Sequence, residues 1–291
     1  MRRLSRWAPQ LVLAPSLAAN LIFVQAFVLW TAALSFTGSR LLPRFDRWVG
    51  LKQYVRLWSN DRWHVACGNL LVYAALFIIA ALALGLLLAI LINQEVRGEG
   101  ALRAVYLYPM ALSSIVTGVA WQWILNPELG IERLVRSWGL RAFTFDWLVN
   151  SDKAIYTVVL ADVWRSSGYV MLLFLAGLRS MDQNLLRAAS IDGAGAFQTY
   201  RRVVLPALRP VFLSAIVLLA QRAIMSYDMV LALTGGGPGY ASDLPAVFMV
   251  SAAFQRSDLG LGAAAAVMML LASLAVVAPY LAHEQRRGDD A

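Results

Sequence analysis

Cysteine, histidine and lysine are scarce in this chain, and each scarcity excludes a class of function. The 291 residues hold one cysteine, Cys67, and two histidines, His64 and His283. An internal disulfide is therefore excluded, and we expect no metal site and no cofactor. Neither of the two lysines, Lys52 and Lys153, follows a glycine, as the lysine of a phosphate-binding Gly-Lys-Ser/Thr loop must. With no nucleophile–base pair in view either, we expect a protein that is not an enzyme and hydrolyses no ATP itself.

Apolar residues, by contrast, are abundant. They make up 60% of the chain, with a mean hydropathy of +0.63, whereas soluble domains are about 45–50% apolar. A helix needs roughly 20 apolar residues to cross a bilayer. Six stretches meet this requirement, at about 11–36, 67–93, 101–126, 154–180, 208–232 and 260–283. They predict an all-α protein with six transmembrane helices in a single domain, 1–291.

The net charge of +8 comes almost wholly from arginine in the loops and at helix ends. In such places anionic lipid head groups are the expected partner, and we expect no nucleic acid. The positive-inside count is close to a tie, because residues 37–64 alone carry six Lys and Arg residues. The basic start, with Arg2, Arg3 and Arg6, favours a retained first helix and cytoplasmic N- and C-termini.

One polar, basic segment, residues 187–210, interrupts the apolar stretches. Its alanines permit close helix approach, Gly193 permits a sharp break, and Asp192 is placed to cap a following short helix. Pro206 and Pro210 suit the entry of the next membrane helix. These features predict a helix-turn-helix that a partner protein can hold. From the residues alone, an ordinary basic loop between two helices is an equal alternative.

The same segment resembles the cytoplasmic "EAA" loop of ABC importer permeases. Ala188-Ala189 is followed after three residues by Gly193 and later by Leu205-Pro206, in the family's order. Arg187 replaces the family's glutamate, which puts in doubt any ion pair that the glutamate would make. Three further segments resemble the carbohydrate branch, specifically the maltose-type first permease: Tyr108-Pro109, Leu233–Pro238 and Phe254–Ala265.

The resemblance implies a MetI-like, type I permease fold in the inner (plasma) membrane. It also implies four kinds of partner: a second homologous permease, two ATPase subunits, an extracytoplasmic sugar-binding protein, and a sugar. A cytoplasmic coupling loop at 181–205 would contact the ATPase. Its residues here are Arg187, Ala188, Ala189, Asp192, Gly193, Ala194, Leu205 and Pro206.

Three charged residues fall inside apolar stretches: Asp162, Arg165 and Arg222. A charge at membrane depth is costly, so it faces a partner charge or a water-filled path. Asp162 and Arg165 are three residues apart and therefore close enough to pair on one helical face. A structural ion pair and a sugar-binding role both remain open. By the resemblance, the substrate site consists of Met110, Ser114, Asp162, Arg165, Ser166, Gln221, Arg222, Ser226 and Tyr227.

The sugar itself is only weakly indicated. Residues 243–266 resemble glucose and mannose permeases, which favours a monosaccharide. A non-sugar solute such as glycerol phosphate is the first alternative. A secondary transporter is less favoured, because the sequence shows neither an internal repeat nor an ion site. A non-transporting scaffold or a membrane-bound enzyme, either without an ATPase partner, is a third class.

Overall fold

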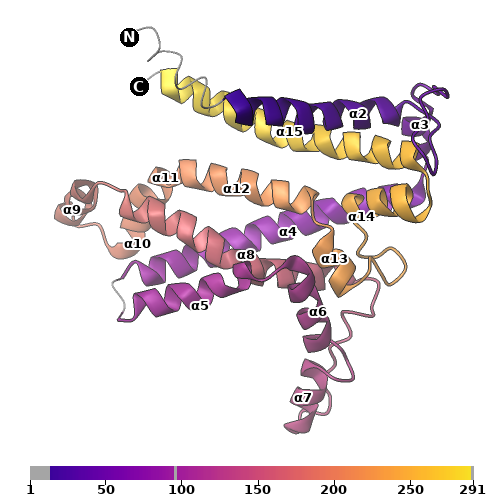
Figure 1. Ribbon diagram of the computed structural model, residues 1–291. Coiled ribbons are helices and arrows are strands. Elements are labelled where there is room, and N and C mark those ends of the chain that lie inside the picture. The colour runs from indigo at the N-terminus through magenta and orange to yellow at the C-terminus, as the bar shows by residue number, and fades with distance from the viewer. Residues whose placement is uncertain (1–13, 95–96, 290–291) are drawn as a thin grey trace, which may run out of the picture. The chain divides into compact units, whose positions relative to one another are not determined.

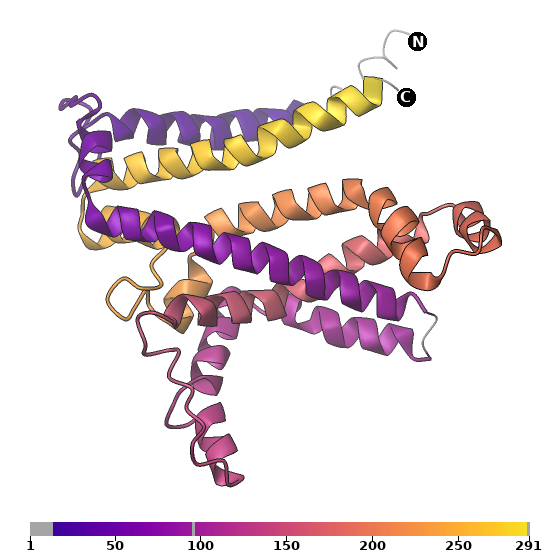
Figure 2. The same cartoon turned by 180° about the vertical axis from the view of Figure 1, so that it is seen from behind.

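A computed structural model describes residues 14–94 and 97–289 of the chain (Figures 1 and 2). Across these residues the structure is helical and contains no strand, only one isolated bridge between Thr37 and Trp48. The expected all-α fold is therefore confirmed. The chain forms two compact units: residues up to Trp63 together with Phe248–Leu271, and His64–Val247 together with the residues from Ala272.

The first unit begins with an apolar span, Ala14–Ser35, which includes the π-helical turn η1 (Asn20–Gln25) and α2 (Ala26–Ser35). A loop leads to α3 (Lys52–Trp58). The unit is completed by the end of α14 (Pro245–Val250), η3 (Ser251–Gln255) and the first part of α15 (Leu259–Asp289). Within this unit α2 lies beside α15 in both views.

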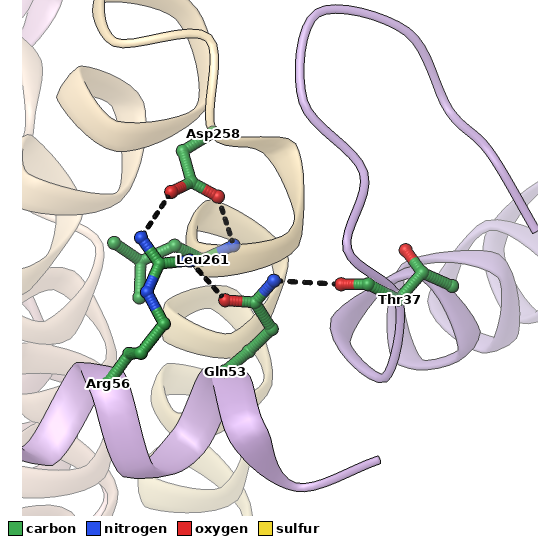
Figure 3. Close-up of polar contacts among 5 residues, drawn as sticks. All are labelled: Thr37, Gln53, Arg56, Asp258 and Leu261. Carbon is green, nitrogen blue, oxygen red and sulfur yellow. Dashed lines mark hydrogen bonds and ion pairs between the residues drawn. The ribbon is translucent and has the colours of Figure 1, made fainter. Parts of the chain in front are cut away.

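A chain of polar contacts joins the loop after α2 to the start of α15 (Figure 3). The Gln53 side chain donates to the Thr37 carbonyl at 2.9 Å and accepts from Arg56 at 2.7 Å. Arg56 also forms an ion pair with Asp258 at 2.7 Å. The other carboxylate oxygen of Asp258 accepts from the Leu261 backbone N–H at 3.2 Å, which caps α15. These contacts link α3 both to the start of the loop at Thr37 and to the N-terminus of α15.

The second unit contains most of α4 (Asp61–Ile92) and the helices up to α13. These are α5 (Glu99–Ala111), α6 (Ser114–Ile124), α7 (Ile131–Ser137), α8 (Ala154–Arg179), α9 (Gln183–Ile191), α10 (Ala196–Thr199), η2 (Tyr200–Val204), α11 (Leu205–Ala207), α12 (Arg209–Ile224) and α13 (Asp228–Leu233). Its core is formed by large buried side chains such as Tyr73, Phe77 and Phe174. Short loops place α9, α10 and α11 at one end of the unit and α6 with α7 at the other (Figures 1 and 2).

Within residues 14–94 and 97–289, four helices are long and apolar enough to cross a membrane, and six spans result if each of two bent pairs counts as one. The expected span at 101–126 is not one helix, because α5 and α6 meet at a 98° bend. Pro109 lies near the end of α5, Leu112 is extended, and Ser113 caps α6 by accepting from the Val116 N–H at 3.2 Å. A proline without an N–H and a strong N-cap together explain the break.

The span expected at 208–232 is also interrupted. Its helix α12 ends at Ile224, and α13 begins only at Asp228. A second bend, of 63°, separates Phe197–Ala207 from Arg209–Ile224, at the entry of α12. Pro206 and Pro210 occupy the first turns of α11 and α12, as the sequence predicted. The non-helical residues 225–227 bring backbone and polar side chains into the middle of the second unit.

Candidate functional site

A polar cavity of about 270 Å³ lies within the second unit, next to the breaks in the helices. The polar and charged residues on its wall come from α4, from the start of α6, from α8 and from the α12–α13 junction. They are Tyr73, Ser114, Asp162, Arg165, Gln221, Arg222, Ser226, Tyr227 and Asp228, and Phe77, Met225 and Met229 complete the lining. Two carboxylates and two guanidinium groups thus face one space inside an apolar bundle.

Asp162 is held by a tyrosine and not by an arginine. The Tyr73 hydroxyl donates to Asp162 Oδ2 at 2.7 Å and lies 3.4 Å from Ser226 Oγ. Both Tyr73 and Asp162 are buried. The ion pair considered between Asp162 and Arg165 does not form in the described part of the chain. The Asp162 carboxylate instead accepts a hydrogen bond from the hydroxyl of Tyr73, on the neighbouring helix α4.

The two arginines of the cavity differ in their partners. Arg165 Nε and Nη2 each lie 3.4 Å from the Leu112 carbonyl oxygen, at the break between α5 and α6. Arg222 forms no ion pair and no hydrogen bond with any residue in the ranges 14–94 and 97–289. Among the described residues its guanidinium group therefore has neither a hydrogen-bond nor an ion-pair partner.

The Gln221 side chain forms its hydrogen bonds with Ser273 of α15. Its amide donates to the Ser273 carbonyl at 3.1 Å, and the Ser273 hydroxyl donates to Gln221 Oε1 at 2.6 Å. The amide is thereby fixed to α15, although part of the residue lines the cavity. These two bonds leave one amide N–H and one oxygen lone pair of Gln221 for a ligand.

The structure brings together most, but not all, of the predicted substrate residues. Met110, near the end of α5, and Ser166, fully buried in α8, are absent from the cavity wall. The other seven predicted residues line it. Sequence reasoning missed Tyr73 and Asp228. A tyrosine in an apolar stretch needs no functional explanation, and the helix break beside Asp228 is visible only in the structure.

The predicted coupling loop folds as two helices around a glycine turn. Helix α9 ends at Ile191, Gly193 has φ +76°, and the Ala194 N–H donates to the Ala189 carbonyl at 3.0 Å. Positive φ favours glycine, so the expected break at Gly193 is found. Among the remaining predicted loop residues, Ala189 is buried, Ala194 and Leu205 are half-buried, and Arg187, Asp192 and Pro206 are exposed; the side chain of Ala188 lies outside the described part.

Large apolar side chains are exposed on this otherwise polar loop. Ile191 is 85% exposed and Phe197 is 74% exposed, on either side of the Gly193 turn. Exposed apolar side chains rimmed by polar residues are typical of protein–protein contact sites. The loop thus has the composition of a docking surface.

An ion-pair cluster lies where α5 begins and α8 ends, just before this loop. Glu99 accepts from Arg179 at 2.6 Å and also pairs with Arg103. Glu99 therefore joins the last turn of α8 to the first turn of α5. The cluster fixes the point from which the predicted coupling loop leaves the helical bundle.

Comparisons with known proteins agree with this architecture. Residues 81–288 match the model of the family described as "Binding-protein-dependent transport system inner membrane component". A probable ABC transporter permease of Pyrococcus horikoshii is 38% identical over 93% of this chain and 93% of its own length. The xylose/arabinose import permease of Haloferax volcanii is 37% identical over 88% of this chain and 81% of its own length.

Among solved structures, a bacterial ABC transporter that imports the acidic polysaccharide alginate superposes with a TM-score of 0.83. The match covers 98% of both chains at 19% identity, which supports the fold alone. The family match and the two relatives extend over most of this sequence. The chain therefore belongs to the family of binding-protein-dependent transport system inner membrane components, the permease subunits of ABC importers.

Proposed function

We propose that this chain is the permease subunit of an ABC importer that carries a sugar into the cytoplasm. The observation that carries the proposal is the polar cavity in the second unit. Its Arg222 forms no hydrogen bond and no ion pair with the described residues. A charge at such depth in an apolar bundle normally faces a solute path or a partner charge. The sugars in the name of the Haloferax relative support a carbohydrate substrate.

The proposed assembly has four other components. A second homologous permease pairs with this chain, two ATPase subunits bind the coupling loops, and an extracytoplasmic binding protein delivers the sugar. One alginate importer structure that matches this chain was determined together with its periplasmic binding protein. The fold shared with that importer supports a partner of the same kind here. ATP-driven closure of the ATPases would then move the coupling loops and reopen the path by rigid-body motion.

We further propose a monosaccharide as the substrate. The cavity of about 270 Å³ is smaller than the roughly 300–1,000 Å³ typical of pockets for drug-sized ligands. One sugar ring is a suitable occupant, with Tyr227 as an aromatic face and Asp228 and Arg222 as hydroxyl partners. A longer oligosaccharide would need a wider space.

A phosphate-bearing solute such as glycerol phosphate is a second candidate, favoured by one observation. Arg165 and Arg222 face the same cavity, and arginine binds phosphate by two parallel hydrogen bonds. Of the two cavity carboxylates, Asp162 is already engaged by Tyr73. Competition of uptake by a panel of neutral monosaccharides and of sugar or glycerol phosphates separates the two candidates.

Orientation gives a first prediction. We expect cysteines at Gln198, in α10, and at the exposed Leu140, which follows α7, to react from opposite sides of the membrane. Each is placed in a Cys67→Ala background. The reason is that α10 and α7 lie at separate ends of the second unit (Figure 1). In intact cells an impermeant maleimide should label the Leu140→Cys protein and reach the Gln198→Cys protein only after the cells are opened. The reverse pattern would invert the proposed topology and exclude an ATPase contact at the loop.

Substrate binding gives a second prediction. Arg222→Gln removes the unpartnered guanidinium, and loss of a charged hydrogen bond of about 1.5–3 kcal/mol should raise the transport KM roughly 10- to 100-fold. Uptake is measured in vesicles containing the full importer, and assembled complex is quantified by gel filtration. Arg141→Gln, an equally neutralising change at an exposed loop position, should leave the KM unchanged.

The same experiment separates binding from scaffolding. Asp162→Asn weakens a buried bond to Tyr73 and should chiefly lower the amount of assembled complex. A normal KM in the Arg222→Gln importer, with less complex recovered, would show that Arg222 is structural and that the cavity assignment is wrong.

A further inference from the structure

We propose that residues 38–47, here named the arginine loop, bind the phosphate group of an anionic phospholipid. The loop belongs to the first unit and lines a cavity of about 220 Å³ that is separate from the substrate cavity. Three arginines contribute to the wall: Arg40, Arg44 and Arg47. None of them has a role in the proposed transport path.

Backbone hydrogen bonds fix the shape of the arginine loop. The Gly38 N–H donates to the Arg47 carbonyl at 2.8 Å and closes its base. Within the loop, the Ser39 hydroxyl donates to the Arg44 carbonyl at 3.0 Å and accepts from the Arg44 N–H at 2.9 Å. The three arginines therefore project from a formed turn.

The charges of the loop are not balanced by the protein. Across the described residues, the side chains of Arg40, Arg44 and Arg47 form neither an ion pair nor a hydrogen bond, and each is exposed. Asp46, the one acid in the loop, forms no ion pair there either, which leaves a net charge of +2. Elsewhere in this unit Arg56 is paired with Asp258. The arginine loop thus offers several guanidinium groups to an external anion.

Its position points to a lipid as the source of that anion. The loop begins three residues after the apolar span that ends at Ser35. Leu41, Leu42 and Trp48 are 74%, 64% and 62% exposed beside the arginines. Phe45 packs edge-on against Trp30 of α2, with ring centroids 4.7 Å apart. Exposed apolar and aromatic side chains next to arginines are typical of the membrane–water interface.

The side of the membrane on which the arginine loop lies also favours an anionic ligand. With both termini in the cytoplasm, as proposed above, the arginine loop lies on the outer face. Short outer loops normally carry few lysines and arginines. Guanidinium groups bind phosphate with two parallel hydrogen bonds, so a bound phospholipid would supply the counter-charge that the described residues do not provide. The apolar Leu41 and Leu42 on the same wall suit the start of its acyl chains.

The test measures lipid binding to the purified permease complex. Native mass spectrometry and thermal unfolding are followed during titration with phosphatidylglycerol, with phosphatidylcholine, and with inorganic phosphate. We expect phosphatidylglycerol alone to bind tightly and to raise the Tm. Each arginine near an anionic head group contributes on the order of fivefold to affinity, so Arg44→Gln/Arg47→Gln should weaken phosphatidylglycerol binding about 30-fold.

The matched control is Arg133→Gln/Arg141→Gln, which removes two exposed arginines from the second unit and should leave phosphatidylglycerol binding unchanged. If both double variants weakened phosphatidylglycerol binding equally, the effect would come from net charge alone, and the proposed site would be wrong. If inorganic phosphate at the same concentration also raised the Tm, the ligand of the loop would be a free anion and not a lipid. If the Arg44→Gln/Arg47→Gln variant bound phosphatidylglycerol normally but its transport complex was no longer stimulated by the binding protein, the loop would be a protein-docking surface. Either of these two results also contradicts the proposal.

Discussion

Alanine in place of Gly168 should remove most of the folded protein, whereas alanine in place of Gly68 should not. A Cβ on Gly168, in α8, would lie 2.0 Å from the carbonyl oxygen of Tyr106 and 2.7 Å from the carbon of the same carbonyl. Both are backbone atoms of α5, so no side-chain rotation relieves the overlap. Helices α5 and α8 would have to separate. Forcing extra atoms into a packed interior costs about 1–3 kcal/mol or more, a large part of a typical stability.

Gly68 provides the matched control, since it also lies in an apolar helix. A Cβ built there meets no atom within 4 Å, and alanine favours helix over glycine by roughly 1 kcal/mol. The measurements are the amount of monodisperse protein in detergent and the apparent Tm of each variant. If Gly168→Ala and Gly68→Ala gave the same yield and the same Tm, the close approach of α5 and α8 would be incorrect.

The long apolar runs made the helical class and the positions of most long helices predictable. Hydrophobicity over about 20 residues reflects one dominant cost, the burial of backbone polar groups in lipid, which a helix removes locally. The stretch expected at 154–180 is α8, Ala154–Arg179. The turn at Gly193 was also predictable, because positive φ is a local property that glycine satisfies best.

The breaks beside the cavity were not predictable in the same way. Pro109 was visible in the sequence, but membrane helices often accommodate a proline when neighbours satisfy the freed carbonyl. Here the bend of 98° depends on the Ser113 cap and on Arg165 reaching the Leu112 carbonyl, and Arg165 lies 53 positions away. Such a contact depends on tertiary packing and leaves no periodic signal.

The partner of Asp162 shows the same limit. A spacing of three residues favoured Arg165, since residues at that spacing share a helical face. The structure places the Tyr73 hydroxyl at 2.7 Å instead. Tyr73 stands in an apolar stretch where an aromatic ring needs no functional explanation. Only the packing of α4 on α8 reveals that its hydroxyl meets a carboxylate.

The second large effect is expected on the coupling loop, at Ile191 and Phe197. Under the proposed function these exposed side chains enter a pocket of the ATPase. Full burial of one such side chain contributes about 1.5–3 kcal/mol, so Ile191→Ala/Phe197→Ala should weaken ATPase binding by about 100-fold or more. Sugar uptake by the assembled importer should fall with it, because ATP hydrolysis can no longer move the loop.

Because both side chains are exposed, a loss of ATPase binding in the double variant can be distinguished from misfolding of the permease. Ile191 and Phe197 are 85% and 74% exposed, so their truncation should leave the yield and the Tm of the permease unchanged. Leu140→Ala removes a 63% exposed side chain in the segment after α7, outside the coupling loop, and should not alter ATPase binding. Co-purification of the ATPase with tagged permease, repeated at increasing salt, measures the contact.

Retention of the ATPase by the double variant at the wild-type level would show that these two side chains do not anchor it. The contact would then depend on the charged residues of the loop, such as Arg187, and the ATPase would dissociate at lower salt from an Arg187→Gln variant than from wild type, because exposed ion pairs are screened.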